Sequence, residues 1–242
     1  MTPAYNELVA SIRQEGEAIV AAGRLGLDAL VTTCGDWTVR DLLLHVGRVY
    51  LRAGTLVSER STTEQDYPPA PDDDADPIDY VCDALDELVA ALASCDPETP
   101  VWNWSEEPPT AAFWARRMAH ESTVHRYDAQ RAHALVEPID ADLAHDGMDE
   151  LVDVILPRVV RRDAPELPTA TVLFSATDDG SWPVRFGPDG VERLEVAKDP
   201  DVTVTGTASA LLLAACNRVP WSAQNVDGDA SLLDAWSDQL RF

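Results

Sequence analysis

The hydrophobic pattern of this chain changes its period part of the way along, and that change limits the folds open to it. Up to about residue 160, apolar residues recur every three or four positions, as on one face of an α-helix. From about residue 165, the segments TATVLFSAT, WPVRFGP, VERLEVA and DVTVTGT are short and alternating, which is typical of strands. The turn sequences DDG, PDG and KDP separate them. The sequence therefore predicts a helical part followed by a small sheet.

The helical part is predicted to hold helices over about 5–31, from Thr38 onward, and over about 77–94, 110–135 and 140–157. Thr38 and Asp41 have the spacing of a capping box, and Trp37 can pack against the helix that follows it. The last of these helices is expected to end before LPRVVRRDAPELP. Helices with one apolar stripe each, joined by Pro- and Asp-rich loops, favour an up-and-down bundle.

After the predicted strands, helical patterns return in SALLLAACNRV and DASLLDAWSDQL. Strands followed by helices predict an α+β layer, with an antiparallel sheet and helices on one face. We therefore expect an α+β protein of two domains. A four-helix bundle is predicted over residues 1–160 and a small α+β domain over 165–242, with the boundary in the Arg- and Pro-rich segment near 158–168.

The composition bears on partners and location. The chain has 43 acidic and 18 basic residues and a net charge of −25, so its surface repels nucleic acids and anionic membranes. A membrane span needs about 18 consecutive apolar residues, and the sequence has no run of that length. The first residues do not resemble a signal peptide, so we expect a cytoplasmic protein. The four scattered cysteines are read as small buried residues: Cys34, Cys82, Cys95 and Cys216.

The predicted helix over 110–135 carries acids and bases on its apolar side. With about 100° of rotation per residue, Glu121, His125 and Asp128 lie on the same face as five apolar residues: Trp114, Met118, Val124, Ala132 and Leu135. A carboxylate on such a face is costly unless it is paired, hydrogen-bonded or bound to a metal. Glu121 and His125, one helical turn apart, can share a metal ion. His120 cannot join them, because it lies about 140° from His125 around the helix.

His45 is predicted to be the third ligand. It falls in the apolar stripe of its helix, so it is expected to be buried; that stripe also holds Leu42, Val46 and Val49. Two histidines and one glutamate leave a fourth position of a zinc ion open for water or a thiol. The alternative for His45 is a core histidine that binds no metal. Asp128 is predicted to orient a ligand imidazole or to hold part of a bound molecule, with a simple salt bridge as the alternative.

WTVRDLLLHVGR (37–48) and FWARRMAHESTVHRYDAQ (113–130) resemble the two signature segments of the mycothiol-dependent maleylpyruvate isomerase family, within the wider group of DinB-like four-helix bundles. DVTVTGTASALLLAACNRVP is similar to that family's smaller α+β domain, which is related to sterol-carrier folds. The resemblance implies a Zn²⁺ ion held by His45, Glu121 and His125, and mycothiol as the thiol cosubstrate. It also implies a catalytic role for Arg218, whose alternative is an arginine favoured by a helix dipole.

The leading hypothesis is a zinc-dependent enzyme that activates mycothiol as a thiolate for attack on a small electrophile. It would act as an S-transferase or a cis–trans isomerase, with Asp128 and Arg218 as catalytic residues. A non-catalytic protein that binds a small ligand is one alternative, and a metal-dependent hydrolase with Asp128 as general base is another. Three tryptophans either line a pocket or, as is commoner for buried aromatic residues, pack in the core: Trp102, Trp104 and Trp114. The sequence does not identify the electrophile, the native metal or the oligomeric state.

Overall fold

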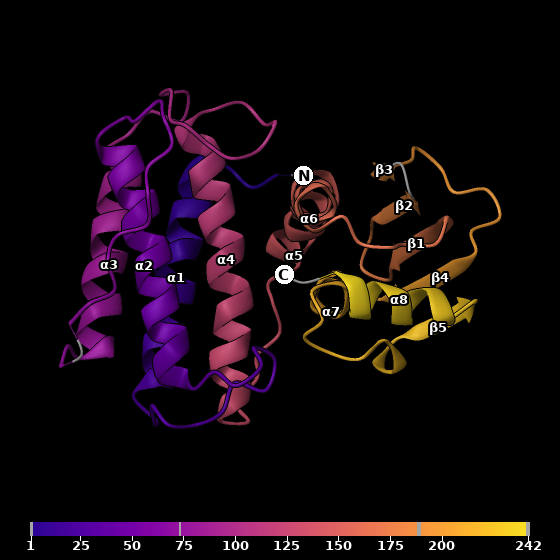
Figure 1. The fold of residues 1–242 in the computed structure, drawn as a ribbon, viewed down its shortest axis with the longest axis horizontal. Coiled ribbons are helices and arrows are strands. Elements are labelled where there is room, and N and C mark those ends of the chain that lie inside the picture. The colour runs from indigo at the N-terminus through magenta and orange to yellow at the C-terminus, as the bar shows by residue number, and fades with distance from the viewer. Residues whose placement is uncertain (1, 73, 188–189, 241–242) are drawn as a thin grey trace. The chain divides into compact units, whose positions relative to one another are not determined.

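The protein is represented by a computed structural model that describes residues 2–72, 74–187 and 190–240 (Figure 1). The chain forms two compact units that divide between Glu137 and Pro138. Among the described residues, none of the helices combines the length and the apolar character that crossing a membrane requires.

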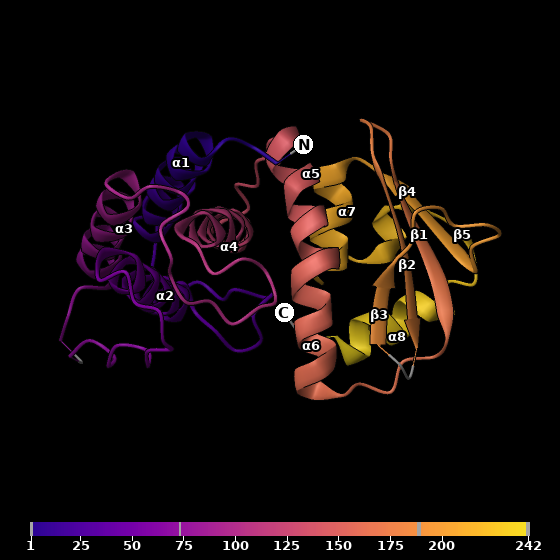
Figure 2. The ribbon, with the colours of Figure 1, turned by 90° about the horizontal axis from the view of Figure 1, so that it is seen from above.

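The N-terminal unit is a bundle of four long helices that run side by side (Figures 1 and 2). They are α1 (Tyr5–Gly23), α2 (Val39–Ser58), α3 (Pro77–Ala93) and α4 (Ala111–Ala132). The most extensive contacts join α2 to α3 and α1 to α4. Fully buried aliphatic side chains fill the space between them, including Ile12, Ile19, Leu42, Leu43, Leu56, Leu85, Leu88 and Leu92. The predicted four-helix bundle is confirmed.

The capping box predicted at the start of α2 is present. The backbone N–H of Asp41 donates to Thr38 Oγ1 at 3.3 Å, and the backbone N–H of Thr38 donates to Asp41 Oδ2 at 2.8 Å. The hydroxyl of Thr38 also donates to Asp41 Oδ2 at 2.6 Å, and this bond, together with the one from the backbone N–H of Thr38, holds the pKa of Asp41 below its usual value. The cap fixes where α2 begins, and so fixes the position of His45 along the helix.

The first helix ends at Gly23, well before the predicted end near residue 31. The chain instead folds back on itself, with the N–H of Val31 donating to the carbonyl of Trp37 at 2.8 Å. Gly35 sits in this loop with φ of +70°, a conformation that favours glycine. Leu30, which continues the helical period in the sequence, is 60% exposed. The loop, rather than a longer helix, carries the chain past the side of α4.

The C-terminal unit contains a sheet with strand order β3-β2-β1-β4-β5 (Figure 1). Its strands are β1 (Ala170–Ala176), β2 (Ser181–Gly187), β3 (Gly190–Arg193), β4 (Val202–Gly206) and β5 (Asn225–Gly228). The α+β class is confirmed. Three of the pairings are antiparallel as expected, but β1 pairs with β4 in parallel, because the segment after β3 returns along the sheet before β4 begins.

An aromatic core holds the sheet to its last helices, α7 (Ala208–Ala215) and α8 (Ser231–Gln239). The ring of Trp236 meets Phe174 edge-on at a centroid distance of 5.4 Å, and Phe186 at 6.1 Å. The indole N–H of Trp236 donates to the carbonyl of Ala215 at 2.9 Å, which satisfies its one polar atom.

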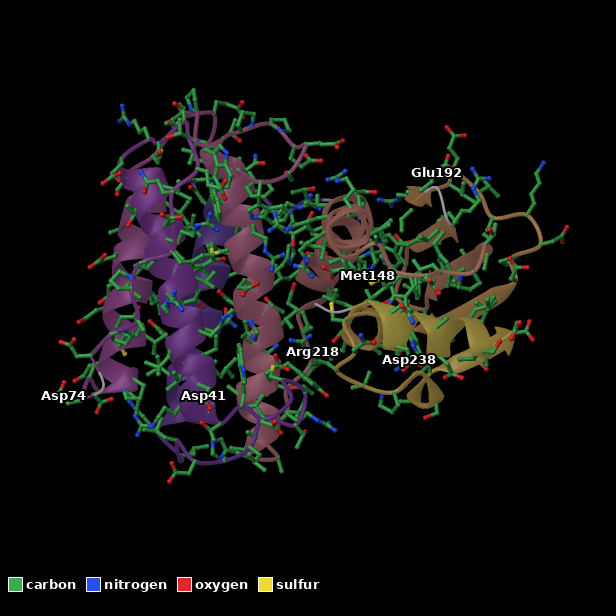
Figure 3. All side chains as sticks on the ribbon, in the orientation of Figure 1. Asp41, Asp74, Met148, Glu192, Arg218 and Asp238 are labelled. Carbon is green, nitrogen blue, oxygen red and sulfur yellow. The ribbon has the colours of Figure 1, made fainter. Side chains whose placement is uncertain are left out.

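The structural division lies before the predicted boundary near 158–168, because the helical segment after Pro138 belongs with the sheet. This segment consists of α5 (Ala141–Glu150), a turn of π-helix, η1 (Leu151–Ile155), and α6 (Leu156–Asp163). Its buried side chains face the C-terminal unit, since α5 contacts α7 and α6 contacts β3. Met148 of α5 is fully buried (Figure 3). An amphipathic helix has the same sequence pattern whichever unit covers it, so periodicity alone misplaces the boundary.

The helix is also longer than predicted, continuing through Pro157 to Asp163. A proline inside an α-helix lacks the N–H that would bond to the carbonyl four residues back. Here the wider π-turn comes just before Pro157, and the proline occupies the first turn of α6, where no such N–H is needed.

Candidate metal centre

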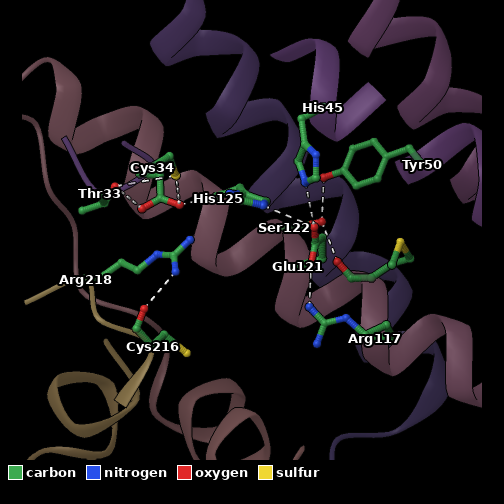
Figure 4. Close-up of polar contacts among 12 residues, drawn as sticks. Thr33, Cys34, His45, Tyr50, Arg117, Glu121, Ser122, His125, Cys216 and Arg218 are labelled. Atoms are coloured by element: carbon green, nitrogen blue, oxygen red, sulfur yellow. Dashed lines mark hydrogen bonds and ion pairs between the residues drawn. The ribbon is translucent and has the colours of Figure 1, made fainter. Parts of the chain in front are cut away.

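The middle of α4 brings together the predicted metal ligands (Figure 4). His125 Nε2 lies 3.2 Å from Glu121 Oε1, one turn along the same helix. From α2, His45 Nε2 lies 3.4 Å from the same oxygen. The three donor atoms all lie within 4.8 Å of one another. The structure therefore assembles the set that the helix faces and the resemblance predicted.

The spacing of these atoms fits a zinc ion. Two ligand atoms bound at about 2.0–2.1 Å to a tetrahedral zinc lie about 3.3–3.4 Å apart. The two distances from Glu121 Oε1 to the histidine nitrogens, 3.2 and 3.4 Å, match that value. Imidazole nitrogen and carboxylate oxygen are both donors that zinc accepts. A metal ion would therefore be held by His45, Glu121 and His125 with little rearrangement.

Opposite charges are paired within the centre. Burial alone would raise the pKa of Glu121, but hydrogen bonds from His125 and His45 and the charge of Arg117 hold it well below its usual value. Burial likewise lowers the pKa of His125, and its hydrogen bonds to Asp128 and Glu121 outweigh this and raise the pKa to about 9. The two shifts are reciprocal: the groups around Glu121 stabilise its carboxylate, and the carboxylates of Asp128 and Glu121 stabilise the charged form of His125.

Asp128 fixes the orientation of His125. Its Oδ2 accepts a hydrogen bond from His125 Nδ1 at 3.0 Å, which leaves Nε2 to face Glu121. The side chain of Asp128 is fully buried, and it also accepts from Thr33 Oγ1 at 2.6 Å and from Cys34 Sγ at 3.5 Å. A ligand histidine held by a carboxylate in this way is the usual arrangement behind zinc. The sequence did not identify Thr33 and Cys34 as partners of Asp128, because no local pattern shows that the loop after α1 reaches α4.

The second carboxylate oxygen of Glu121, Oε2, is hydrogen-bonded to Arg117. Arg117 Nη2 donates to Glu121 Oε2 at 2.7 Å, and the two side chains are 13% and 19% exposed. Arg117 lies one turn before Glu121 on α4, at the spacing that places two side chains side by side. That spacing is visible in the sequence and could have identified Arg117.

His45 is half-exposed, which corrects the prediction that it is buried: its side chain is 37% exposed. The apolar stripe of α2 places it beside the core, but at the stripe's edge. Its ring packs on that of Trp37 at a centroid distance of 5.0 Å. Both residues line a cavity of about 490 Å³, which is also lined by other residues of α2 and by Ala70, Pro71, Asp72 and Ala75. The cavity therefore reaches one of the three donor residues, His45.

One other expectation about α4 needs correction. Leu135, expected on the buried face, is 54% exposed, because the helix ends at Ala132. The three tryptophans pack with their neighbours near the start of α4. Trp114 Nε1 donates to the carbonyl of Trp102 at 2.7 Å, and Trp104 meets Phe113 edge-on at 5.3 Å. Among the described residues that line the cavity beside His45, none is one of these three tryptophans.

Arg218 belongs to the C-terminal unit, just after α7 (Figure 3). Its Nη1 donates to the carbonyl of Cys216 at 2.8 Å. This hydrogen bond holds the Arg218 side chain against the backbone of its own unit. Its catalytic role stays a prediction.

The fold and the metal centre together define a class: a four-helix bundle with two histidines and a glutamate at its centre, followed by an α+β unit. The same fold occurs in two crystal structures of a mycothiol-dependent maleylpyruvate isomerase. The first, a histidine-to-alanine mutant, has a TM-score of 0.62 and 14% identity over 94% of this chain and 95% of that one. The second has a TM-score of 0.60 and 14% identity over 90% and 92%.

Comparison with models of protein families identifies the family of this chain. The model of the mycothiol maleylpyruvate isomerase N-terminal domain matches residues 9–130, and the model of the corresponding C-terminal domain matches residues 142–235. The chain belongs to the mycothiol maleylpyruvate isomerase family. None of the curated proteins matches it.

Proposed function

We propose that this protein is a zinc-dependent enzyme that uses mycothiol, a low-molecular-weight thiol, against a small electrophile. It acts as a cis–trans isomerase or as a thiol S-transferase. The observation that carries the proposal is the convergence of His45, Glu121 and His125 on one point at the spacing of zinc ligands. Membership of the family supports the choice of thiol.

Each residue of the centre has a role in this proposal. A bound Zn²⁺ ion supplies positive charge that lowers the pKa of a thiol, so that the thiolate is present at neutral pH. His45, Glu121 and His125 hold that charge in place, and Asp128 keeps the Nδ1 proton of His125 on the side away from Glu121. In this proposal, the reactants approach through the cavity beside His45 and Trp37.

The two activities share their first bond. A thiolate sulfur adds to a carbon of a conjugated cis double bond, which becomes a single bond, and the electron pair moves to the conjugated group. Rotation about the single bond and loss of the thiolate give the trans isomer and return the thiol unchanged. A transferase instead keeps the new S–C bond, and the electrophile takes up a proton or releases a leaving group.

The hydrogen bonds of the two carboxylates argue against the hydrolase alternative. A hydrolase needs a general base that can take a proton from water. Asp128 already accepts hydrogen bonds from His125, Thr33 and Cys34, and Glu121 Oε2 accepts from Arg117. These hydrogen bonds favour a holding role for both carboxylates over the role of a general base.

Metal analysis combined with a thiol assay tests the proposal. Purified protein is expected to contain about one zinc per chain, and Glu121→Ala and His125→Ala are expected to lose it. Asp86→Asn, which alters an exposed ion pair with Arg13, is the matched control and should retain the metal. With mycothiol, the wild type should isomerise maleylpyruvate or conjugate a test electrophile. A protein that neither contains nor takes up zinc would instead support the ligand-binding alternative. Zinc retention together with thiol-independent hydrolysis would support the hydrolase.

A further inference from the structure

The two oxygens of Glu121 have different partners. Oε1 faces the two histidine nitrogens, at 3.2 Å from His125 and 3.4 Å from His45. Oε2 turns the other way and accepts a hydrogen bond from Arg117 Nη2 at 2.7 Å (Figure 4). The carboxylate is therefore divided between a metal-facing oxygen and an arginine-facing oxygen.

This division bears on how many positions of a metal ion Glu121 can fill. A carboxylate can bind a cation through one oxygen or through both. Three single-atom ligands leave one position of a tetrahedral zinc open, whereas a glutamate that used both oxygens would occupy the remaining position as well. A hydrogen bond between opposite charges is about twice as strong as a neutral one, and here it holds Oε2 away from the point where the donors converge.

We propose that Arg117 is a positioning residue that restricts Glu121 to one metal-binding oxygen and so keeps the fourth position of the metal open for the thiol. The inference rests on the proposed function, since it assumes a metal held by His45, Glu121 and His125. It adds a residue that neither the ligand set nor the predicted catalytic pair includes.

Burial separates this pair from an ordinary surface ion pair. The side chains of Arg117 and Glu121 are 13% and 19% exposed, whereas those of the Arg13–Asp86 pair between α1 and α3 are 35% and 69% exposed. Exposed pairs are screened by water and add little. The Arg117–Glu121 pair is largely shielded, so its geometry is enforced more strongly. The Arg13–Asp86 pair is the natural control.

The test uses Co²⁺ as a visible substitute for zinc and 2-mercaptoethanol as the probe thiol. In the wild type, one Co²⁺ per chain is expected, and adding the thiol should produce a sulfur-to-cobalt charge-transfer absorption. Arg117→Met removes the donor and keeps much of the side-chain volume. We expect this variant to bind Co²⁺ with the same stoichiometry but to bind the thiol at least about tenfold more weakly. A factor of about ten is the smallest effect usually seen when a residue that supports a metal ligand is changed. Arg117→Lys, which keeps a charged donor, should restore most of the thiol absorption. Arg13→Met should match the wild type.

The possible outcomes distinguish a failure of this inference from a failure of the proposed function on which it rests. A wild type that takes up no Co²⁺ overturns the proposed metal centre, and the inference with it. Normal Co²⁺ binding in the wild type, with an unchanged thiol titration in Arg117→Met, overturns the inference alone. Loss of Co²⁺ from a correctly folded Arg117→Met protein also overturns it, because Arg117 would then support metal binding itself. Circular dichroism of the metal-free variants establishes folding, and Arg117→Ala, which also removes the donor, supplies the same comparison if the methionine variant does not fold.

Discussion

Replacing Asp128 by asparagine tests whether the hydrogen bonds behind His125 contribute to metal binding. Asp128 is fully buried and accepts from three donors: His125 Nδ1, Thr33 Oγ1 and Cys34 Sγ. Asparagine has nearly the same shape but only one accepting oxygen, and its amide group carries two N–H donors. In Asp128→Asn the amide nitrogen can face the hydroxyl of Thr33, which then accepts, and the amide oxygen can keep the bond from His125 Nδ1; what is lost is the negative charge opposite His125.

The size of the effect follows from the role of this bond. Changing a residue that orients a metal-ligating histidine typically weakens metal binding by about 10- to 100-fold. At about 1.4 kcal/mol for each factor of ten, this corresponds to roughly 1.4–2.7 kcal/mol of binding free energy. The 3.0 Å bond from His125 Nδ1 to a fully buried carboxylate places Asp128→Asn in the upper half of that range.

Competition between the protein and a chelator of known zinc affinity measures the change. Thr33→Val is the matched control, because it removes the 2.6 Å bond to Asp128 Oδ1 but keeps the carboxylate charge and the bond to His125. We expect Thr33→Val to weaken zinc binding by less than about tenfold, below the range for the bond to the histidine itself. Wild-type zinc affinity in a folded Asp128→Asn protein would refute the reasoning.

Three further predictions concern stability and pH. Glu15→Gln removes the charged partner of the buried Arg126, whose Nε lies 2.5 Å from Glu15 Oε2. Urea melts should show a loss of about 3 kcal/mol in the free energy of unfolding, the low end of the usual cost of breaking a buried ion pair. The low end applies because Arg126 also donates to Gln130. An unchanged midpoint would contradict the expected loss. Leu88→Ala leaves a cavity between α2 and α3 and should cost about 2–5 kcal/mol in the same assay, whereas a cost below about 1 kcal/mol would show that the helices close over it. Burial raises the pKa of Tyr50, so this tyrosine keeps its proton in the folded state after it ionises in the unfolded chain. The wild type should therefore lose stability as the pH rises above about 10, and thermal melts of Tyr50→Phe should show a shallower decline; equal slopes would exclude this contribution.

Local patterns predicted much of this molecule because many of its features are local. The capping box of Thr38 and Asp41 is a contact within one turn, and the Glu121–His125 pair is set by helix geometry alone. The change of period near residue 165 likewise marked the strands. In each case the residues that interact are neighbours in the chain, so the sequence contains the whole arrangement.

The features that the sequence did not predict depend on tertiary contacts. Thr33 reaches Asp128 across 95 positions of the chain, and only the folded loop brings them together. The exposure of His45 depends on how far the neighbouring loop covers the edge of α2, which the period of the helix does not specify. The unit boundary was misplaced for the same reason, since the pattern of α5 and α6 does not say which apolar surface covers them.

The position of His45 on α2, 76 residues before Glu121 on α4, also links metal occupancy to folding of the bundle. An isolated α4 segment could offer only the one-turn pair, whereas all three donors meet only after α2 has packed beside α4. A cation bound by all three would act as a removable cross-link between two helices. By mass action, free metal at a hundred times its dissociation constant would add about 2.7 kcal/mol to the free energy of unfolding. Chelation would therefore lower the melting temperature of the whole bundle even when every side chain is intact.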